Sequence, residues 1–122
     1  MVASSKGVAA PPPVRHDLEL YEQLAEHVEA LAPDVTRRRM FGSPALCVGR
    51  KMAVCVFGDA MGMRVPQPLA AEALESGRAL PFQPHGKSRM REWVMITGGE
   101  DAIEPNSDLI LAAVDYARAN NV

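Results

Sequence analysis

The amino-acid sequence predicts an α+β fold, a two-layer sandwich in which an antiparallel sheet is flanked by helices. Two observations support this prediction. Apolar residues recur every three to four positions near both ends of the chain, whereas the middle consists of short apolar runs separated by glycine-containing turns. These turns are too short for the crossover helices of a parallel sheet, so we expect the element order α-β-β-β-β-α-β-α.

Residues 1–15 precede the predicted domain, which spans residues 16–122. They contain the sequence Ala-Ala-Pro-Pro-Pro, which removes backbone hydrogen-bond donors, and they have no periodic apolar face. We therefore expect a flexible proline-rich tail. A short spacer is favoured over a ligand for an SH3-like partner.

Residues 16–31 have the pattern of an amphipathic helix. Four apolar residues recur at helical spacing, and we expect them to face the core: Tyr21, Leu24, Val28 and Leu31. Glutamates occupy positions between them. Asp17 is the expected N-cap, and the sequence Ala32-Pro33-Asp34 ends the helix.

Four strands are predicted next, at residues 37–41, 45–48, 52–57 and 60–65. The turns between them are Gly42-Ser43-Pro44, Gly49-Arg50-Lys51 and Gly58-Asp59. Met40 and Phe41 are expected in the core, and Gly42 in a turn with unusual dihedral angles. Because residues 52–57 are apolar at nearly every position, both faces of the sheet should be apolar. The helices should cover one face, which leaves the other for a homodimer or a partner.

The second half of the chain is predicted to contain two more helices and a last strand. Pro66 and Pro68 begin a short helix at residues 69–76 that Gly77 ends, and a short extended piece follows at residues 80–82. An exposed loop at residues 83–88 leads to the strand at residues 93–96. Asn106 or Ser107 caps the closing helix at residues 105–120, whose apolar face is formed by Leu109, Ile110, Ala113, Val114 and Ala117.

The composition is that of an ordinary globular domain. The chain of 122 residues is 48% hydrophobic and has a net charge of −2, which argues against a general binder of nucleic acid or anionic membranes. No apolar run approaches the about 20 residues of a membrane span, and the N-terminus lacks the pattern of a signal peptide, so we expect a cytoplasmic protein.

The two cysteines, Cys47 and Cys55, are too few for a disulfide scaffold. A hairpin that turns near Gly49 places them either on opposite faces of the sheet or diagonally on one face, depending on the register. Neither arrangement suits a disulfide. Buried reduced thiols are favoured over redox or metal roles.

A set of short motifs resembles the N-terminal domain of the TfoX/Sxy family, which is named after a regulator of competence genes in bacteria. The motifs are Arg39-Met40-Phe41-Gly42, then Gly49 with Lys51-Met52, and later Pro81-Phe82 and Gly86-Lys87. They occur in the order that the family has, and the similarity spans residues 16–118. Ser43 and Pro44 depart from the family pattern, which has a second glycine at this point.

The resemblance implies a secretion-chaperone-like α+β fold and a regulatory role through protein contacts, without enzymatic activity. The family's named regulator continues into a C-terminal helical domain, whereas this sequence ends at Val122. It is therefore similar to a stand-alone copy of the N-terminal domain.

Basic residues form the candidate site for an anion or an acidic partner. They fall into two groups, Arg37, Arg38 and Arg39 in the first predicted strand, and Lys87, Arg89 and Arg91 after the glycine loop. Alternation along a strand places Arg37 and Arg39 on one face and Arg38 on the other. If the two groups adjoin in the sheet, their guanidinium groups suit phosphate or carboxylate. Solvated edge charges that discourage aggregation are the favoured alternative.

No motif predicts a catalytic centre, a cofactor or a metal site. His16 lies at a helix start, His27 on the polar side of that helix and His85 in a loop, without zinc spacing. The glycines Gly58, Gly62 and Gly98 are interpreted as turn residues rather than a nucleotide motif. Several methionines fill the core or furnish an adaptable surface: Met52, Met61, Met63, Met90 and Met95.

We therefore expect a small non-enzymatic interaction or regulatory domain whose partner is an unknown protein or a second copy of the chain. The alternative is a nucleic-acid-associated regulator of transcription or competence that uses the arginines and lysine named above. That alternative requires these charges on one face and a steep salt dependence of binding.

Overall fold

The computed structural model of the protein describes residues 15–82 and 91–120. Its helices are α1 (Leu18–Leu31), α2 (Gln67–Glu75) and α3 (Ser107–Ala119), with two 3-10 turns, η2 (Gly99–Ala102) and η3 (Glu104–Asn106), before α3. Its strands are β1 (Thr36–Met40), β2 (Ser43–Val48), β3 (Lys51–Phe57), β4 (Ala60–Arg64), β5 (Leu80–Pro81) and β6 (Trp93–Ile96).

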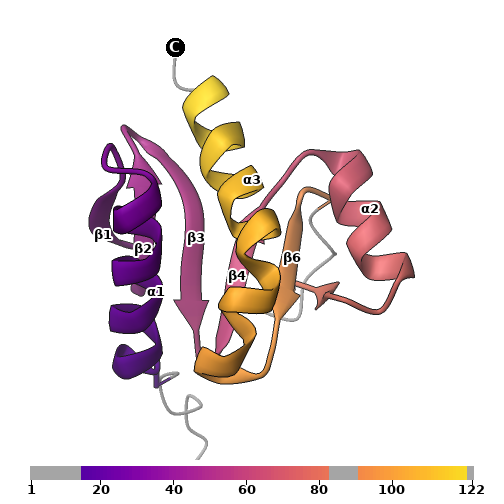
Figure 1. The fold of residues 1–122 in the computed structure, drawn as a ribbon, viewed down its shortest axis with the longest axis horizontal. Coiled ribbons are helices and arrows are strands. Elements are labelled where there is room, and N and C mark those ends of the chain that lie inside the picture. Colours follow the sequence, from indigo (N-terminus) through magenta and orange to yellow (C-terminus); the bar gives the residue numbers. More distant parts are fainter. Residues whose placement is uncertain (1–14, 83–90, 121–122) are drawn as a thin grey trace, which may run out of the picture.

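The strands form one antiparallel sheet with the order β1-β2-β3-β4-β6-β5. Helices α1 and α3 lie on the same face of this sheet, and α2 lies beside β6 (Figure 1). The predicted α+β two-layer fold is therefore confirmed. The predicted loop at residues 83–88 and almost all of the tail lie outside the described residues.

The extended piece at residues 80–82 is a sixth strand, which the predicted element order did not count. Leu80 and Pro81 pair with Met95 and Val94 of β6. This strand is at the edge of the sheet, where Pro81 needs no ladder donor, so a proline there is compatible with strand pairing. The pattern of two residues was too short to predict the pairing.

Helix α1 begins as predicted but buries a different stripe. The Asp17 carboxylate accepts hydrogen bonds from the backbone N–H groups of Glu19 and Leu20, at 3.1 and 3.0 Å. The prediction that Leu31 faces the core is wrong, because its side chain is 56% exposed. The buried positions follow a spacing of four residues, and this spacing reaches Ala32 rather than Leu31: Leu20, Leu24, Val28 and Ala32.

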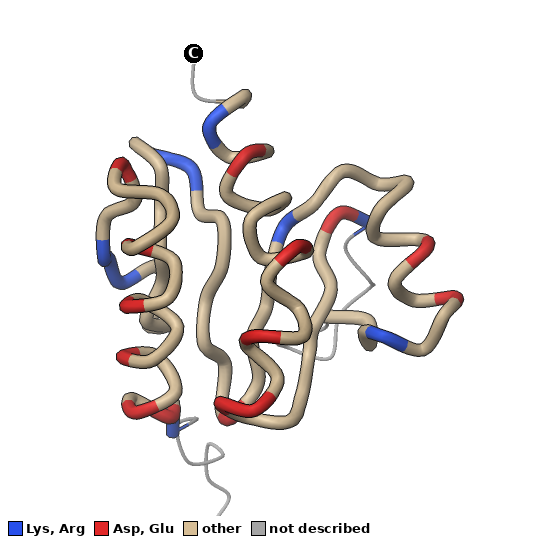
Figure 2. The backbone as a smooth tube through the Cα atoms, in the orientation of Figure 1, with Lys and Arg blue, Asp and Glu red and all other residues tan. Residues whose placement is uncertain are grey.

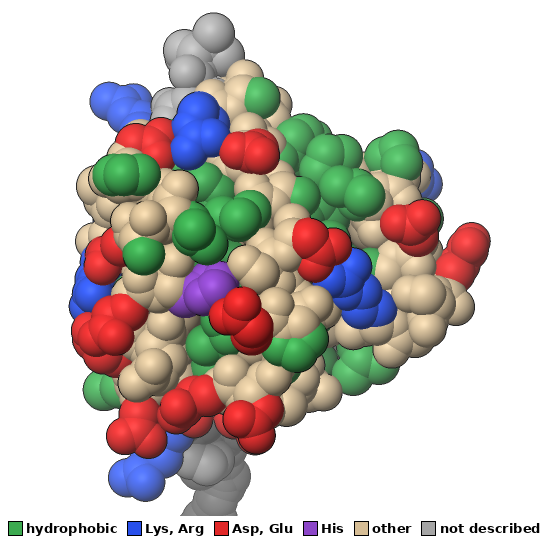
Figure 3. All heavy atoms as spheres, viewed as in Figure 1, with side chains coloured by type: hydrophobic (Ala, Val, Ile, Leu, Met, Phe, Trp, Pro, Cys, Tyr) green, Lys and Arg blue, Asp and Glu red, His purple; other side chains and the backbone are tan. Residues whose placement is uncertain are grey.

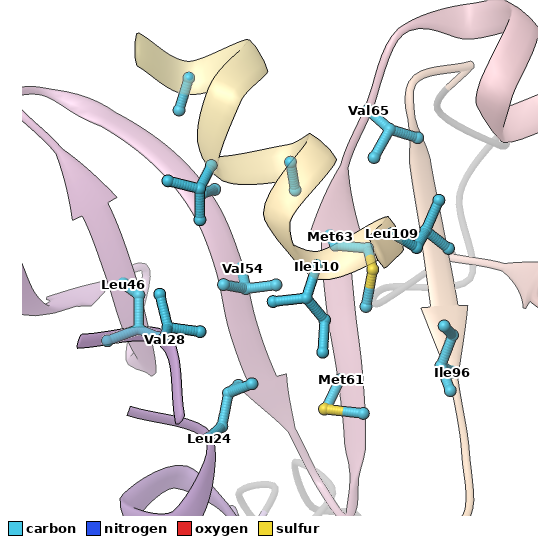
Figure 4. Close-up of a cluster of buried hydrophobic side chains, with 14 of the residues drawn as sticks. Leu24, Val28, Leu46, Val54, Met61, Met63, Val65, Ile96, Leu109 and Ile110 are labelled. Carbon is cyan, nitrogen blue, oxygen red and sulfur yellow. The ribbon is translucent and has the colours of Figure 1, made fainter. Parts of the chain in front are cut away.

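The main core lies between the sheet and the two helices that cover it. Figure 4 shows side chains from α1, the central strands and α3 meeting in this layer, and Met61 and Met63 of β4 lie among them, fully buried. All five apolar residues predicted for the face of α3 are buried. Asn106 is the N-cap, one of the two predicted residues, but its side chain makes no capping bond and instead donates to the carbonyl of Ala102.

Tyr21 links α1 to the sheet at the edge of this core. Its hydroxyl donates a hydrogen bond of 2.8 Å to the backbone carbonyl of Ala45 in β2. Burial of the Tyr21 hydroxyl is the main cause of the change in its pKa, which is raised. Among the described residues, none of the helices combines the length and the apolar character needed to cross a bilayer.

Candidate functional site

The face of the sheet that points away from α1 and α3, here called the rear face, carries a second apolar cluster. Its buried members are Ala45, Cys47, Cys55 and Phe82, and half-buried side chains pack around them: Met40, Met52, Phe57, Trp93 and Met95. Strand alternation explains this, because residues 52–57 send successive side chains to opposite faces. The expectation that both faces of the sheet are apolar is confirmed.

A row of rings crosses the rear face. The ring centroids of Phe57 and Phe82 are 5.8 Å apart in an edge-to-face arrangement, and those of Phe82 and Trp93 are 5.5 Å apart. His16 extends the row, with its ring 5.5 Å from that of Phe57 and its Nδ1 accepting a hydrogen bond from the backbone N–H of Gly58. Contacts of this kind stabilise a rigid platform rather than a mobile surface.

The two cysteines lie diagonally on this rear face, which is one of the two predicted arrangements. Cys55 pairs with Ala45, and a register shift between Leu46 and Cys47 sets the position of the second thiol. Both cysteines are buried and free, as predicted. Burial raises the pKa of Cys55 to about 12 and also raises that of Cys47, so neither thiol is activated as a nucleophile at neutral pH.

Gly62 is a strand residue and not the turn glycine that was predicted. It pairs with Cys55 on one side and with Met95 on the other. A Cβ atom at this position would lie 3.1 Å from the Cys55 sulfur and 3.1 Å from the Phe82 ring. The glycine therefore lets the aromatic ring lie directly on the backbone of β4.

A hollow of about 560 Å³, here called the Phe41 hollow, opens next to this apolar cluster. Side chains from β1, β3, β4 and β6 and from the segments beside them line it: Met40, Phe41, Met52, Arg64, Gln67, Arg91, Glu92 and Trp93. Four strand spacings separate β1 from β6, about 19 Å in a flat sheet. Residues from both strands nevertheless line one hollow, which the sequence pattern did not predict.

Phe41 was predicted to be a core residue of a strand, and this prediction is wrong. Its side chain is 92% exposed, and it occupies the two-residue turn between β1 and β2. The backbone φ angles are +52° at Phe41 and +82° at Gly42. Positive values at both central residues are typical of a type I′ hairpin turn, which favours Asn-Gly or Gly-Gly and disfavours a bulky aromatic at the first position.

Among the described residues, the rim of the Phe41 hollow carries an ion pair between Arg64 and Glu92 and a cation, Arg91, that has no ion-pair partner. Arg64 donates to Glu92 at 2.8 Å and lies 5.2 Å from the centre of the Tyr116 ring, and the Tyr116 hydroxyl also donates to Glu92. The Tyr116 and Arg64 hydrogen bonds lower the pKa of Glu92. Arg91 is exposed and makes no ion pair with any of the described residues, so it leaves a positive charge at this rim.

The predicted arginines of β1 have unequal environments. Arg37 forms ion pairs with Glu29 at 2.8 Å and Glu22 at 2.9 Å, and these hydrogen bonds raise the pKa of its guanidinium. Figure 2 shows these basic positions at one edge of the molecule, beside the acidic positions of α1. Within the described part of the chain, Arg38 and Arg39 donate to backbone carbonyls, those of Gly49 and Gly42, and form no ion pair.

Of the second group of predicted basic residues, the structure describes Arg91. The pairing of Arg37 with Leu46 and of Arg38 with Ala45 confirms that neighbouring arginines of β1 face opposite sides. Arg91 precedes β6, and three strands lie between β6 and β1. Lys87 and Arg89 lie outside the described residues. Of the family motif, Met40, Phe41 and Met52 line the Phe41 hollow, whereas Gly42 and Gly49 have the positive φ angles of turn residues.

The opposite face of the molecule carries a smaller hollow of about 300 Å³ between α2 and α3, lined partly by Leu69, Ala73 and Leu109. Figure 3 shows carboxylates spread over the helix-bearing face. His27 is half-buried there, not on a free polar side, with its Nε2 at 2.8 Å from the Ser107 hydroxyl and its Nδ1 at 3.7 Å from Glu104. No group of histidines, cysteines and carboxylates within the described residues could hold a metal ion. His85 and Met90 lie outside them.

Comparison with known proteins gives one result. The model of the TfoX N-terminal domain family matches residues 22–115, a range that begins within α1 and ends within α3. No curated protein matches the chain, and no solved structure does.

Proposed function

This chain belongs to the TfoX N-terminal domain family, and from this premise we propose that it is a non-enzymatic regulatory domain that binds another protein at the Phe41 hollow. The partner that fits inserts an apolar side chain into the hollow and places a carboxylate beside it. The proposal is argued from Phe41, from the floor of the hollow and from the charge at its rim.

Phe41 is the observation that carries the proposal. A non-glycine residue in the left-handed region costs about 1–2 kcal/mol relative to the right-handed one, and this aromatic side chain recovers almost nothing by burial because it is 92% exposed. Asparagine or glycine at this position would make the turn, and so the fold, more stable. An unfavourable residue at an exposed turn supports a role in binding, since strained positions cluster at functional sites.

The floor and the rim of the hollow indicate what the partner presents. Met40 and Met52 have flexible thioether side chains that adapt to different apolar shapes, and Trp93 adds a flat aromatic surface. Aromatic and arginine residues are the usual anchors of protein interfaces. Arg91 at the rim has no ion-pair partner among the described residues, so a carboxylate in the partner can pair with it.

The non-enzymatic part of the proposal rests on the reactive groups of the described residues. Both thiols are buried with raised pKa values, and the His27 ring already contacts Ser107. These groups come from different layers of the fold and do not converge on the Phe41 hollow. A catalytic site needs a nucleophile or base within hydrogen-bond reach of a common reacting atom.

Site-specific photo-crosslinking tests the proposal. A benzophenone amino acid is placed at position 41 or, as a matched control, at position 31, where Leu31 is also exposed but lies on α1. We expect position 41 alone to capture a defined protein from a cell extract. An excess of unlabelled wild-type protein should abolish capture, whereas an excess of Phe41→Asn should not.

The captured protein is then purified and its affinity for the wild type and for Phe41→Asn is measured by calorimetry. Equal capture from positions 31 and 41, or equal affinity of the two proteins, would contradict the proposal. A crosslink between two copies of the chain would show that the partner is a second copy and that the chain forms a homodimer.

The alternative function, a nucleic-acid-associated regulator, is favoured only by Arg38 and Arg39, which have no carboxylate partner among the described residues. Light scattering at several salt concentrations, with and without a mixed nucleic-acid pool, tests it. A mass increase that needs nucleic acid and disappears steeply with salt would favour the alternative. A mass unaffected by nucleic acid favours the protein-binding domain.

A further inference from the structure

We propose that strand β1 is a second binding site, which takes an extended acidic polypeptide segment as an additional strand of the sheet. This inference concerns a surface other than the Phe41 hollow and does not depend on the function proposed above. Three observations support it: the backbone of β1 at the edge of the sheet, the small groove beside it, and two arginines that have no carboxylate partner among the described residues.

Among the described strands, β1 pairs with β2 alone, so the backbone groups of β1 that point away from β2 lie at the edge of the sheet. Met40 and Ser43 close the two-residue turn and therefore exchange hydrogen bonds, as the closing pair of such a hairpin does. Alternation then directs the N–H and C=O groups of Arg38 toward β2 and those of Arg37 and Arg39 outward. Pro44 stands opposite Arg39 and has no N–H to give, which agrees with this alternation.

The two edges of the sheet differ in how they resist strand addition. Edge strand β5 has two residues, and one of them is Pro81. Edge strand β1 has five residues and no proline. The register shift in this part of the sheet lies in the neighbouring strand β2. Short length and proline protect an edge from pairing, and β1 has neither device, so only its charges select what can pair there.

A groove of about 310 Å³ runs beside the outer part of β1. It is lined by Leu18, Tyr21, Pro44 and the three arginines of β1. Leu18 is 61% exposed at the start of α1. An added strand would send alternate side chains toward this groove, and an apolar side chain there would cover Leu18.

The charges of β1 select acidic residues in the added strand. Arg37 is already neutralised by Glu22 and Glu29. Arg38 and Arg39 each donate to a single backbone carbonyl, whereas a guanidinium has five donors. They face opposite sides of the sheet, so carboxylates on both sides of an added strand meet a cation. Opposite charges across neighbouring strands stabilise the pairing and like charges oppose it.

The experiment begins with selection of binders from a random library of short linear peptides on the full chain. We expect the selected peptides to be rich in aspartate and glutamate, with an apolar residue between them. The affinity of the strongest peptide is then measured by fluorescence anisotropy for Arg39→Ala and Arg39→Pro. Both variants lose the same charge, but only the proline also loses the outward N–H group.

Arg39→Pro should bind the peptide about fivefold more weakly than Arg39→Ala, the effect of one hydrogen bond. Arg78→Ala is the matched control, since Arg78 is also exposed but lies beside β5 at the opposite edge of the sheet, and the affinity of this variant should equal that of the wild type. In the wild type, peptide binding should slow the hydrogen exchange of the Arg37 and Arg39 amides. This last measurement uses the wild-type protein, so it does not depend on whether a variant folds.

Several outcomes would overturn the inference. They are selection of neutral or basic peptides, equal affinities of the two Arg39 variants, and unchanged exchange at Arg37 and Arg39 in the presence of the peptide. Displacement of the peptide by a single-stranded oligonucleotide, with a steep salt dependence, would also overturn it, because the arginines would then form an anion patch and not a strand-pairing site.

Discussion

Replacing Phe41 by asparagine is expected to stabilise the fold while it removes binding at the Phe41 hollow. Asparagine adopts the left-handed conformation more readily than phenylalanine, and Asn-Gly is the preferred pair for a type I′ turn. Because Phe41 is 92% exposed, the apolar surface that the substitution uncovers is worth only about 0.4 kcal/mol. Relief of about 1 kcal/mol of backbone strain exceeds this loss.

We therefore expect a net gain of about 0.6 kcal/mol in the free energy of unfolding, or about 3 °C in Tm for a domain of this size. Urea unfolding followed by fluorescence measures it, because Trp93 is the single tryptophan of the chain. Phe41→Ala is the matched control, since it removes the same ring but keeps a residue that disfavours positive φ. Its stability should not exceed that of the wild type.

A lower stability of Phe41→Asn than of the wild type would refute this reasoning. The Phe41 ring would then have a structural role, and the argument from an exposed, strained residue to a binding function would lose its basis. A more stable variant that still binds the partner would refute the proposed function and leave the account of the turn intact.

The remaining predictions concern the core, the rear face and one carboxylate. Leu20→Ala should lower the free energy of unfolding by about 2–5 kcal/mol because Leu20 is fully buried, whereas Leu31→Ala should change it by less than about 0.5 kcal/mol; chemical denaturation of both checks the corrected stripe of α1. Gly62→Ala should destabilise the fold by about 1–2 kcal/mol, since the new methyl group overlaps the Phe82 ring, and should alter the emission of the neighbouring tryptophan; an unchanged protein would show that the ring moves aside freely. The pKa of Glu92 lies below the ordinary glutamate value of 4.5 in the folded protein, so its ion pair stabilises the fold above that value and is lost as the pH falls through the folded pKa. The stability difference between the wild type and Glu92→Gln, followed by denaturation at several pH values, should therefore be largest near neutral pH and shrink below about pH 4; a constant difference would contradict this linkage.

The positions of most helices and strands could be predicted from local patterns. The strand at residues 93–96 and the buried face of α3 agree with their predictions, as does the N-cap at Asp17. These features depend on neighbours within a few residues, so the pattern of apolar residues and turn glycines contains the necessary information. Leu31 was wrongly predicted to face the core because the helical spacing of apolar residues does not by itself specify which side of the apolar stripe packs on the sheet.

The candidate site could be predicted only in part. The family motif directed attention to residues 39–42, and this range contains Phe41. Apolar character alone assigned Phe41 to the core, however, because the sequence Phe-Gly does not reveal a type I′ turn that exposes its first residue. A two-residue loop between two well-formed strands was the available signal, and it depends on the register of β1 with β2.

By itself, the sequence determined the fold class, the identity of most secondary-structure elements and the resemblance to the TfoX N-terminal domain, because periodicity, caps and short motifs are local properties. The tertiary structure decided which residues meet across the sheet. Two features depend on contacts between distant segments: Phe41 and Trp93 line one hollow, and the glutamates of α1 pair with Arg37 but, among the described residues, not with Arg38 or Arg39. Such contacts follow from strand order, register and packing, which no window of neighbouring residues specifies.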